Sequence, residues 1–121
     1  MSAAYFIAGT DTDVGKTTIA TGLLYAARQS GLSTAAGKPV ASGCDVKPKG
    51  LRNPDAVALR AECSVELTYN EVNPIAFEPP IAPHLAAREA GVALTVQSLL
   101  GPMRHILEKK ADFTLIEGAG G

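Results

Sequence analysis

A segment rich in glycine and threonine, Gly-Thr-Asp-Thr-Asp-Val-Gly-Lys-Thr at residues 9–17, carries residue types that bind nucleotide phosphates. Its small residues let backbone N–H groups turn inward around phosphate oxygens, and a following helix adds the positive end of its dipole. Lys16 can reach the β- and γ-phosphates, and the Thr17 hydroxyl suits Mg²⁺. Five residues separate Gly9 from Gly15, one more than the general consensus. We expect a phosphate-binding loop here.

Three further residues could complete such a site. Glu117 ends an apolar segment, where parallel α/β sheets place ligand contacts, and its carboxylate could complete a magnesium shell. Asp55 lies in the first turn of an expected helix, where an acid also has a purely structural reason to occur, because it complements the helix dipole. Lys38 follows an expected strand and would share the sheet edge of the phosphate loop, where two lysines would suit an anionic intermediate. A surface lysine is the other interpretation of Lys38.

The elements that must position these side chains alternate along the first third of the chain. Residues 4–9 form an apolar run that predicts a buried strand, and residues 16–30 repeat apolar side chains at helical spacing. Gly31 is a suitable C-terminal cap for that helix. Residues 33–39 predict a second strand, so the three elements form a βαβ unit with a right-handed crossover.

The remaining segments predict more helices and one more strand. Asn53 caps a helix after a loop at 40–52, and an ordered loop at 69–83 follows it. Residues 83–90 form a short helix that ends at Gly91. We expect a helix from Thr95 to Lys110 that Pro102 kinks or divides, and then a strand over 112–117. One face of that long helix is apolar, and the expected sheet core includes aromatic residues: Val96, Leu99, Leu100, Met103, Ile106 and Leu107 on the helix, and Tyr5, Phe6 and Phe113 in the sheet.

This alternation predicts an α/β protein with three layers, a parallel sheet of the P-loop nucleoside-triphosphatase kind with helices on both faces. The 121 residues are enough for a single nucleotide-binding domain, which we expect to span 1–121. A parallel strand is normally covered by the helix that follows it, and the sequence stops directly after the strand ending at Glu117. We therefore expect the chain to be truncated and to form the N-terminal part of a longer enzyme.

The composition and net charge limit the binding partners and the cellular compartment that we expect for the protein. The net charge of −1 gives no electrostatic reason to bind nucleic acid or an anionic membrane surface. Neither an 18-residue apolar span nor a signal-peptide pattern is present, which favours the cytoplasm. Cys44 and Cys63 show no metal-ligand spacing, so we expect two free thiols, and Cys44 is a candidate reactive thiol beside the loop after Lys38.

Several short motifs together resemble the dethiobiotin synthetase family across essentially the whole chain. The phosphate loop at 9–17 has that family's additional residue, and five more motifs follow in the family's order: Lys-Pro-Val-Ala-Ser-Gly at 38–43, Leu-Arg-Asn-Pro-Asp-Ala at 51–56, Val-Asn-Pro at 72–74, Pro-His at 83–84 and Glu-Gly-Ala-Gly-Gly at 117–121. The family often has Glu at position 13, where this chain has Asp13, a side chain one methylene shorter.

The resemblance implies a reaction, the conversion of 7,8-diaminononanoate and CO₂ to a cyclic urea with ATP as co-substrate and Mg²⁺ as cofactor. It implies Lys38 and Lys16 as catalytic residues, with Thr12, Lys38 and Ser42 binding the diamine. Mg²⁺ would be held by Thr17, Asp55 and Glu117. The implied ATP contacts comprise these three metal ligands and eight more residues: Asp13, Val14, Gly15, Lys16, Thr18, Gly118, Ala119 and Gly120. A homodimer is also implied, as is an adenine-binding segment in the family's C-terminal half.

Two other functions are compatible with a phosphate loop. An ATP-driven switch of the partitioning or septum-positioning type would share the fold, but such proteins usually carry a lysine early in the loop, where this chain has Thr10 or Asp11. An inactive nucleotide-binding fragment is the second. Dependence of ADP release on the diamine separates the synthetase from both.

Overall fold

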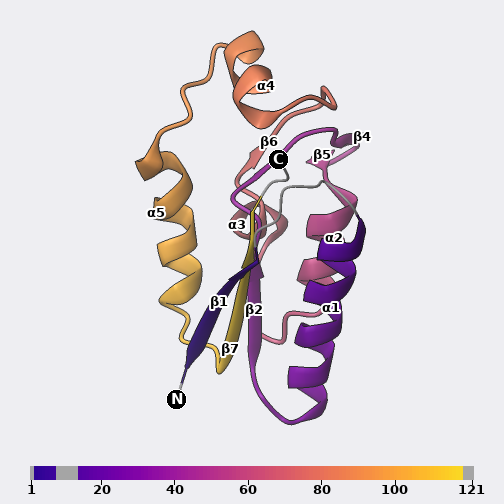
Figure 1. The fold of residues 1–121 in the computed structure, drawn as a ribbon, viewed down its shortest axis with the longest axis vertical. Helices are drawn as coiled ribbons and strands as arrows, with labels where there is room; N and C mark the ends of the chain where they lie inside the picture. Colours follow the sequence, from indigo (N-terminus) through magenta and orange to yellow (C-terminus); the bar gives the residue numbers. More distant parts are fainter. Residues whose placement is uncertain (1, 8–13, 119–121) are drawn as a thin grey trace.

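The computed structural model describes residues 2–7 and 14–118, which form both strands and helices (Figure 1). The main sheet has three strands, β1 (Ala3–Ile7), β2 (Thr34–Gly37) and β7 (Phe113–Glu117). The remaining elements are the helices α1 (Val14–Gln29), α2 (Pro54–Ala61), α3 (Tyr69–Val72), α4 (Pro83–Ala90) and α5 (Val96–Leu107), and the short strands β3 (Val40–Ala41), β4 (Asp45–Lys47), β5 (Gly50–Arg52) and β6 (Ile75–Ala76).

The three strands of the main sheet are parallel and lie in the order β1-β7-β2. The strand-helix-strand unit predicted from the sequence is present, and the last strand along the chain, β7, lies between its two strands. Ile7 pairs with Glu117, and Gly37 pairs with Ile116. The carboxyl ends of all three strands therefore meet at one edge of the sheet, where open α/β sheets bind ligands.

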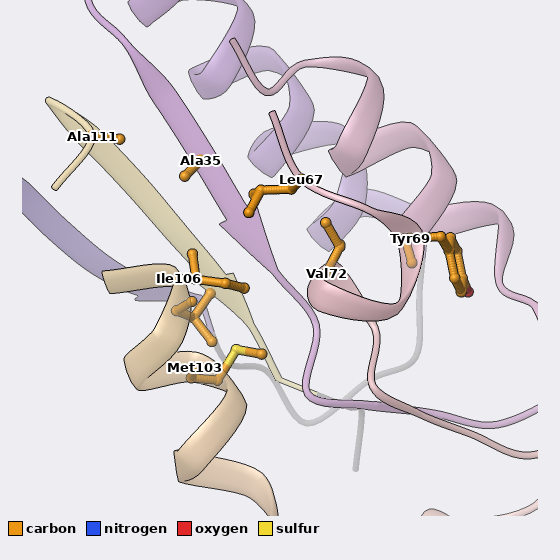
Figure 2. Close-up of a cluster of buried hydrophobic side chains, with 9 residues drawn as sticks. Ala35, Leu67, Tyr69, Val72, Met103, Ile106 and Ala111 are labelled. Atoms are coloured by element: carbon orange, nitrogen blue, oxygen red, sulfur yellow. The ribbon is translucent and has the colours of Figure 1, made fainter. Parts of the chain in front are cut away.

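Helices cover both faces of this sheet, which confirms the predicted fold class. Along β2, Ala35 packs into one apolar cluster and Ala36 into another, as the twofold alternation of a strand requires. The first cluster holds side chains of α3 and α5, among them Val72, Met103 and Ile106 (Figure 2). The second holds side chains of α1 and α2, which lie on the opposite side of the sheet in Figure 1.

Helices α1 and α2 run side by side in the same direction. Arg28, in the last turn of α1, donates hydrogen bonds to the Ala61 carbonyl and the Glu62 carboxylate at the C-terminal end of α2. The predicted Asn53 cap is confirmed, because its side chain accepts a hydrogen bond from the Ala56 N–H at 2.9 Å. Gly31 has φ of +86° after the end of α1, as a glycine cap requires. The N-terminal ends of both helices therefore point toward the carboxyl edge of the sheet.

Two segments that the sequence predicted as loops contain regular structure. Residues 40–52 hold β3 and the antiparallel hairpin of β4 and β5, and residues 69–83 hold α3 and β6, so both predictions were wrong there. Strands β3 and β6 pair in parallel over only two residues each. Such short strands have too few positions for a periodic pattern, which explains why sequence periodicity missed them.

The C-terminal helices match the predictions in part. Helix α4 spans 83–90 and ends at Gly91 in the left-handed conformation, as predicted. Helix α5 begins after its Thr95 cap but ends at Leu107 rather than Lys110, and it is one continuous helix despite Pro102. Met103 and Ile106 follow the proline and are buried, and this burial offsets part of its cost. The predicted apolar face is only partly covered, because three of its residues are exposed: Val96, Leu100 and Leu107.

The exposure of side chains on strand β1 contradicts another prediction. Tyr5 and Phe6 were expected in the sheet core, yet their exposed fractions are 54% and 64%. Strand β1 lies at the edge of the three-stranded sheet, and the two apolar clusters lie over β2 and β7 instead. Phe113 is half-buried and packs its ring against Tyr5, with 5.4 Å between the ring centroids. Among the described residues, no helix is both long and apolar enough to cross a bilayer.

Candidate functional site

Glu117 is the centre of a buried polar cluster at the carboxyl edge of the sheet. Its exposed fraction is 1%, and it ends β7, the strand in the middle of the sheet. Its carboxylate accepts hydrogen bonds from the Thr17 hydroxyl, at 3.0 and 3.2 Å from its two oxygens, and from the Lys38 ammonium at 3.1 Å. Three of the residues that the sequence singled out are therefore in direct contact.

The parallel topology brings these residues together from distant parts of the sequence. Thr17 lies in the first turns of α1, Lys38 directly follows β2, and Glu117 ends β7. Because β2 and β7 are parallel neighbours whose carboxyl ends meet at this edge, a residue directly after β2 lies beside the end of β7. The prediction that Lys38 lies at the carboxyl edge of the sheet is confirmed, and its contact with Glu117 is a new finding.

Lys38 and Glu117 form a buried ion pair, since their side chains are 7% and 1% exposed. Removing two charges from water is costly, and the mutual attraction repays that cost only when the remaining polar atoms also find partners. The Thr17 hydroxyl supplies one such partner for Glu117, and no buried side-chain N or O atom in the described part of the chain lacks a hydrogen bond. The surface-lysine interpretation of Lys38 is therefore wrong.

Lys16 reaches across to the residue directly after Glu117. Its ammonium donates a hydrogen bond to the Gly118 carbonyl at 2.8 Å, and the Gly118 N–H donates to the Ile7 carbonyl at 3.0 Å. A Cβ atom at Gly118 would lie 3.3 Å from two ring atoms of Phe6, so a side chain would fit only if that ring moved. The segments 16–17 and 117–118 are thus joined by side-chain hydrogen bonds.

The donor set at the centre of the cluster fits a magnesium ion. A carboxylate and a hydroxyl are hard oxygen ligands, and the contact between Thr17 and Glu117 brings theirs together. No group of three or more His, Cys, Asp or Glu side chains in the described ranges could hold a metal. The pairing of a carboxylate with a hydroxyl suits Mg²⁺, which usually binds one or two carboxylates together with substrate phosphates and water.

Asp55 lies near this edge without joining the cluster. It is half-buried in the first turn of α2 and makes no hydrogen bond or ion pair with any part of the chain that the structure describes. Because α2 runs in the same direction as α1, Asp55 lies at the helix end that faces the site. Ser42 directly follows β3 and is likewise half-buried, with no hydrogen bond within the described ranges.

The rest of the sequence-predicted nucleotide contacts lie at the ends of the described ranges. Val14 and Gly15 begin α1, and Thr18 is exposed on the same helix. Four other predicted site residues lie outside the described residues: Thr12, Asp13, Ala119 and Gly120.

Sequence reasoning missed two buried polar residues behind Lys38. The Asn73 side-chain amide donates to the Lys38 carbonyl at 2.9 Å, and the Tyr69 hydroxyl donates to Asn73 Oδ1 at 2.8 Å. Asn73 stands in the Val-Asn-Pro motif at 72–74, but neither residue had an assigned role. An asparagine followed by proline, in a segment without periodicity, is typical of a turn. Nothing in the sequence therefore indicated that Asn73 is a buried hydrogen-bonding group.

The two cysteines are free, as predicted, but neither has the environment of a reactive thiol. Cys44 is buried, and this burial raises the pKa of its thiol. Burial likewise raises the pKa of Cys63, to about 11. Because the thiolate is the nucleophile, the suggestion that Cys44 is reactive was wrong.

Comparison with known proteins identifies the family. Residues 3–121 match the family model described as an AAA domain. The chain belongs to this AAA-domain family. It is 65% identical over 118 residues to an ATP-dependent dethiobiotin synthetase of Pseudomonas paraeruginosa, a match that covers 98% of this chain and 52% of that protein. The corresponding protein of Cellvibrio japonicus is 55% identical over 118 residues, covering 98% of this chain and 51% of the relative.

These matches confirm the family resemblance that the motifs predicted. A dethiobiotin synthetase of Pseudomonas aeruginosa is 63% identical over the same length, again with 52% of that protein covered. The chain thus spans about half the length of the curated relatives that it matches.

Proposed function

We propose that the protein to which this chain belongs is an ATP-dependent dethiobiotin synthase, which joins CO₂ to 7,8-diaminononanoate and closes a cyclic urea. The observation that carries this proposal is the contact of Glu117 with both Thr17 and Lys38. It joins a residue suited to hold Mg²⁺ near the phosphates to a lysine suited to stabilise a second anion. The family match and the names of the relatives support the same reaction.

The roles that we propose for individual residues follow the resemblance to the dethiobiotin synthetases. Residues 13–18, with Gly118 to Gly120, would surround the ATP phosphates, and Lys16 would reach the β- and γ-phosphates. Thr17 and Glu117, with Asp55 from the start of α2, would hold Mg²⁺. Lys38 would contact the reacting carbamate, and Thr12 and Ser42 would bind the diamine beside it.

The proposed reaction has three steps. One amine of the diamine attacks CO₂, forms a C–N bond and loses a proton, which leaves a carbamate anion. A carbamate oxygen then attacks the γ-phosphorus, ADP departs, and a mixed carbamic–phosphoric anhydride forms. The second amine attacks the carbonyl carbon of this anhydride, phosphate departs, and the five-membered urea closes.

The protein's part in these steps is positioning and charge stabilisation rather than covalent catalysis. Lys38 would hold the carbamate oxygens in line with the γ-phosphorus, and Lys16 would stabilise the negative charge of the transferring phosphoryl group. Bound Mg²⁺ would neutralise charge on the triphosphate. The pairing of Lys38 with the buried Glu117 supports this account, because it fixes the direction of a long and otherwise flexible side chain.

The proposal is tested by the substrate dependence of ADP release. ADP formation should require both the diamine and bicarbonate as the source of CO₂. An ATP-driven switch would hydrolyse ATP whether or not these substrates are present, and a nucleotide-binding fragment would release no ADP in either case. Either of those results would contradict the proposal.

We extend the proposal to the domain organisation, the oligomeric state and the compartment of the protein. Residues 1–121 would form one nucleotide-binding domain, and the active protein would be a homodimer. Its compartment would be the cytoplasm, where two unpaired thiols such as Cys44 and Cys63 are ordinary.

A further inference from the structure

A chain of buried hydrogen bonds runs from the start of α2 to the main chain of Lys38. The Asn53 N–H donates to the Tyr69 hydroxyl at 2.6 Å, and that hydroxyl donates to Asn73 Oδ1 at 2.8 Å. The Asn73 side-chain amide then donates to the carbonyls of Lys38 and Ile75, at 2.9 and 3.2 Å. Asn53, Tyr69 and Asn73 are all buried, so water does not compete for these bonds.

The available donors and acceptors fix the direction of every hydrogen bond in this series. The Tyr69 phenol has a single proton, and because it accepts from the Asn53 N–H it must use that proton toward Asn73. The atom of Asn73 that faces it is therefore the amide oxygen. The amide nitrogen faces two carbonyl oxygens, which only a donor can satisfy. No other residue type offers one acceptor and two donors on so short a side chain.

The segment at 72–73 holds Lys38 on both sides of its Cα atom. The Lys38 N–H donates to the Val72 carbonyl at 2.7 Å, while its own carbonyl accepts from Asn73. Both backbone polar groups of Lys38 are thus fixed by adjacent residues. Its side chain, in turn, reaches Glu117. A shift of this segment would move the Lys38 main chain and displace the ammonium.

At its other end the chain of hydrogen bonds fixes the beginning of α2. Asn53 caps that helix through its side chain, and its backbone N–H is held by Tyr69. Asp55 lies two residues later, in the first turn. The Arg52 guanidinium lies 4.2 Å from the centroid of the Tyr69 ring, a cation–π contact that also holds the ring in place. Figure 2 shows Tyr69 at the margin of the apolar cluster, with its ring directed away from Met103 and Ile106.

We propose that Tyr69 and Asn73 are positioning residues, which hold Lys38 and the Asp55-bearing end of α2 in one fixed relation. This inference rests on the proposed function, in which Lys38 contacts the carbamate and Asp55 helps to hold Mg²⁺. Tyr69 and Asn73 do not touch the reacting atoms themselves. They act through the main chain of Lys38 and through the cap of α2.

Two variants of the full-length protein divide the chain of hydrogen bonds at different points. Tyr69→Phe keeps the ring and its contact with Arg52 but leaves the Asn53 N–H without its acceptor. Asn73→Ala leaves the bond between Asn53 and Tyr69 possible but removes both donors to the carbonyls. We expect kcat to fall about tenfold in each variant, because a small misplacement of a catalytic group has large kinetic effects.

The requirement for Mg²⁺ separates the two variants. It is measured, without the diamine, as the Mg²⁺ concentration that gives half-maximal binding of a non-hydrolysable ATP analogue in titration calorimetry. We expect Tyr69→Phe to raise this concentration about tenfold, as is typical when support behind a metal ligand is lost. Asn73→Ala should leave it close to the wild-type value, since its main effect is on Lys38.

Thr34→Val is the matched control for loss of a buried hydrogen bond. The Thr34 hydroxyl donates to the Glu62 carbonyl at 2.7 Å and accepts from the Ser64 N–H at 2.8 Å, at the opposite end of β2 from Lys38. This variant should lower the melting temperature while leaving kcat and the Mg²⁺ requirement unchanged. If Tyr69→Phe and Asn73→Ala behave like Thr34→Val in both measurements, the positioning role is wrong.

The two readouts also separate this inference from the proposed function. If the wild-type protein releases no ADP in response to the diamine, the proposed function fails, whereas the binding titration still tests the support of the α2 end. A shift of the Mg²⁺ requirement in Tyr69→Phe alone would then support the positioning role. An unchanged requirement in that variant would overturn it.

Discussion

The Thr17 hydroxyl donates a hydrogen bond to the Glu117 carboxylate, and these two residues stand one hundred positions apart in the sequence. The bond joins the first turns of α1 to the end of β7, the central strand of the sheet. Lys38 contacts the same carboxylate from the end of β2. One buried acid therefore links α1, the helix after the predicted phosphate loop, to the lysine proposed to act in catalysis.

Replacement of Lys38 should affect turnover more than nucleotide binding. Lys38→Ala removes the proposed partner of the carbamate, so kcat should fall about 10²- to 10³-fold, as for loss of one preorganised charge-stabilising group. It also leaves Glu117 buried without its ion partner, so the free energy of unfolding should fall by about 3–5 kcal/mol. Steady-state kinetics, ATP titration and denaturant unfolding measure the three quantities. Lys109→Ala, an exposed lysine after α5, is the control. Equal losses in turnover and ATP affinity would contradict the assigned role.

Loss of the Thr17 hydroxyl should weaken binding of ATP in the presence of magnesium. Thr17→Val keeps the side-chain shape but removes the oxygen that we propose to bind Mg²⁺, together with a hydrogen-bond donor to Glu117. We expect the Mg²⁺ concentration for half-maximal ATP binding to rise about tenfold or more. Thr21→Val, one turn later on α1, is the matched control, because the Thr21 hydroxyl donates to the Thr17 and Thr18 carbonyls of its own helix. An unchanged metal dependence in Thr17→Val would remove Thr17 from the metal shell.

A glycine beside the site should prove sensitive to a single methyl group. A Cβ atom at Gly37 would lie 2.6 Å from Met103 Sδ and 2.7 Å from Ile106 Cδ1, where α5 packs on the end of β2. Met103 can yield because its side chain is flexible, but Ile106 is fully buried, so Gly37→Ala should lower the free energy of unfolding by about 1–2 kcal/mol.

Gly22→Ala is the control for that substitution. Apart from the backbone of its own helix, no atom of the described residues lies within 4 Å of a Cβ at Gly22 in α1. Because alanine is the better helix former, this variant should be more stable by about 0.5–1 kcal/mol. Denaturant unfolding of both variants should therefore give changes of opposite sign. A neutral Gly37→Ala would show that α5 packs less tightly against β2 than the distances indicate.

Glu71 should make the stability of the protein depend on pH in the acid range. Its carboxylate accepts from the Thr68 N–H in the capping box of α3 and also pairs with His105, and these bonds lower its pKa to about 2. A lowered pKa in the folded state means that the stabilisation is complete above the unfolded pKa, 4.5, and is lost as the pH falls through about 2.

The comparison of wild-type protein with Glu71→Gln measures this effect. Glutamine can still complete a capping box, but it has no charge to titrate. The wild type should be the more stable protein at pH 7, and the difference in unfolding free energy should shrink between pH 4.5 and about 2. A difference that stays constant over this range would show that the charge of Glu71 contributes nothing to stability.

The regular core of the fold was predictable because its signals are local. The apolar runs of β1, β2 and β7 and the helical spacing of α1 are each contained within one element. The helix caps were equally predictable, because Asn53, Gly91 and Thr95 are residue types that strongly prefer the ends of helices. The place of Lys38 at the carboxyl edge was predictable from the parallel topology, whereas its contact with Glu117 depends on the strand order β1-β7-β2, which no local pattern specifies.

The features that sequence reasoning missed depend on contacts between distant segments. The pair β3–β6 and the buried bonds of Tyr69 and Asn73 join residues whose partners no local pattern specifies. The capping box of α3 was a local signal, Thr68 with Glu71, but the prolines around it favoured a loop. Tyr5 was assigned to the core from its apolar type, whereas its place on an edge strand left it exposed.

In the proposed function, the site at Lys38 and Glu117 builds a urea from CO₂ and uses ATP to do so. The most direct measurement tracks ¹³C-labelled bicarbonate by carbon NMR in a reaction with ATP, Mg²⁺ and 7,8-diaminononanoate. We expect label to appear in a cyclic urea carbonyl in step with ADP release, and Lys38→Ala to slow both signals together by about 10²- to 10³-fold. ADP release without labelled urea would contradict the proposed function.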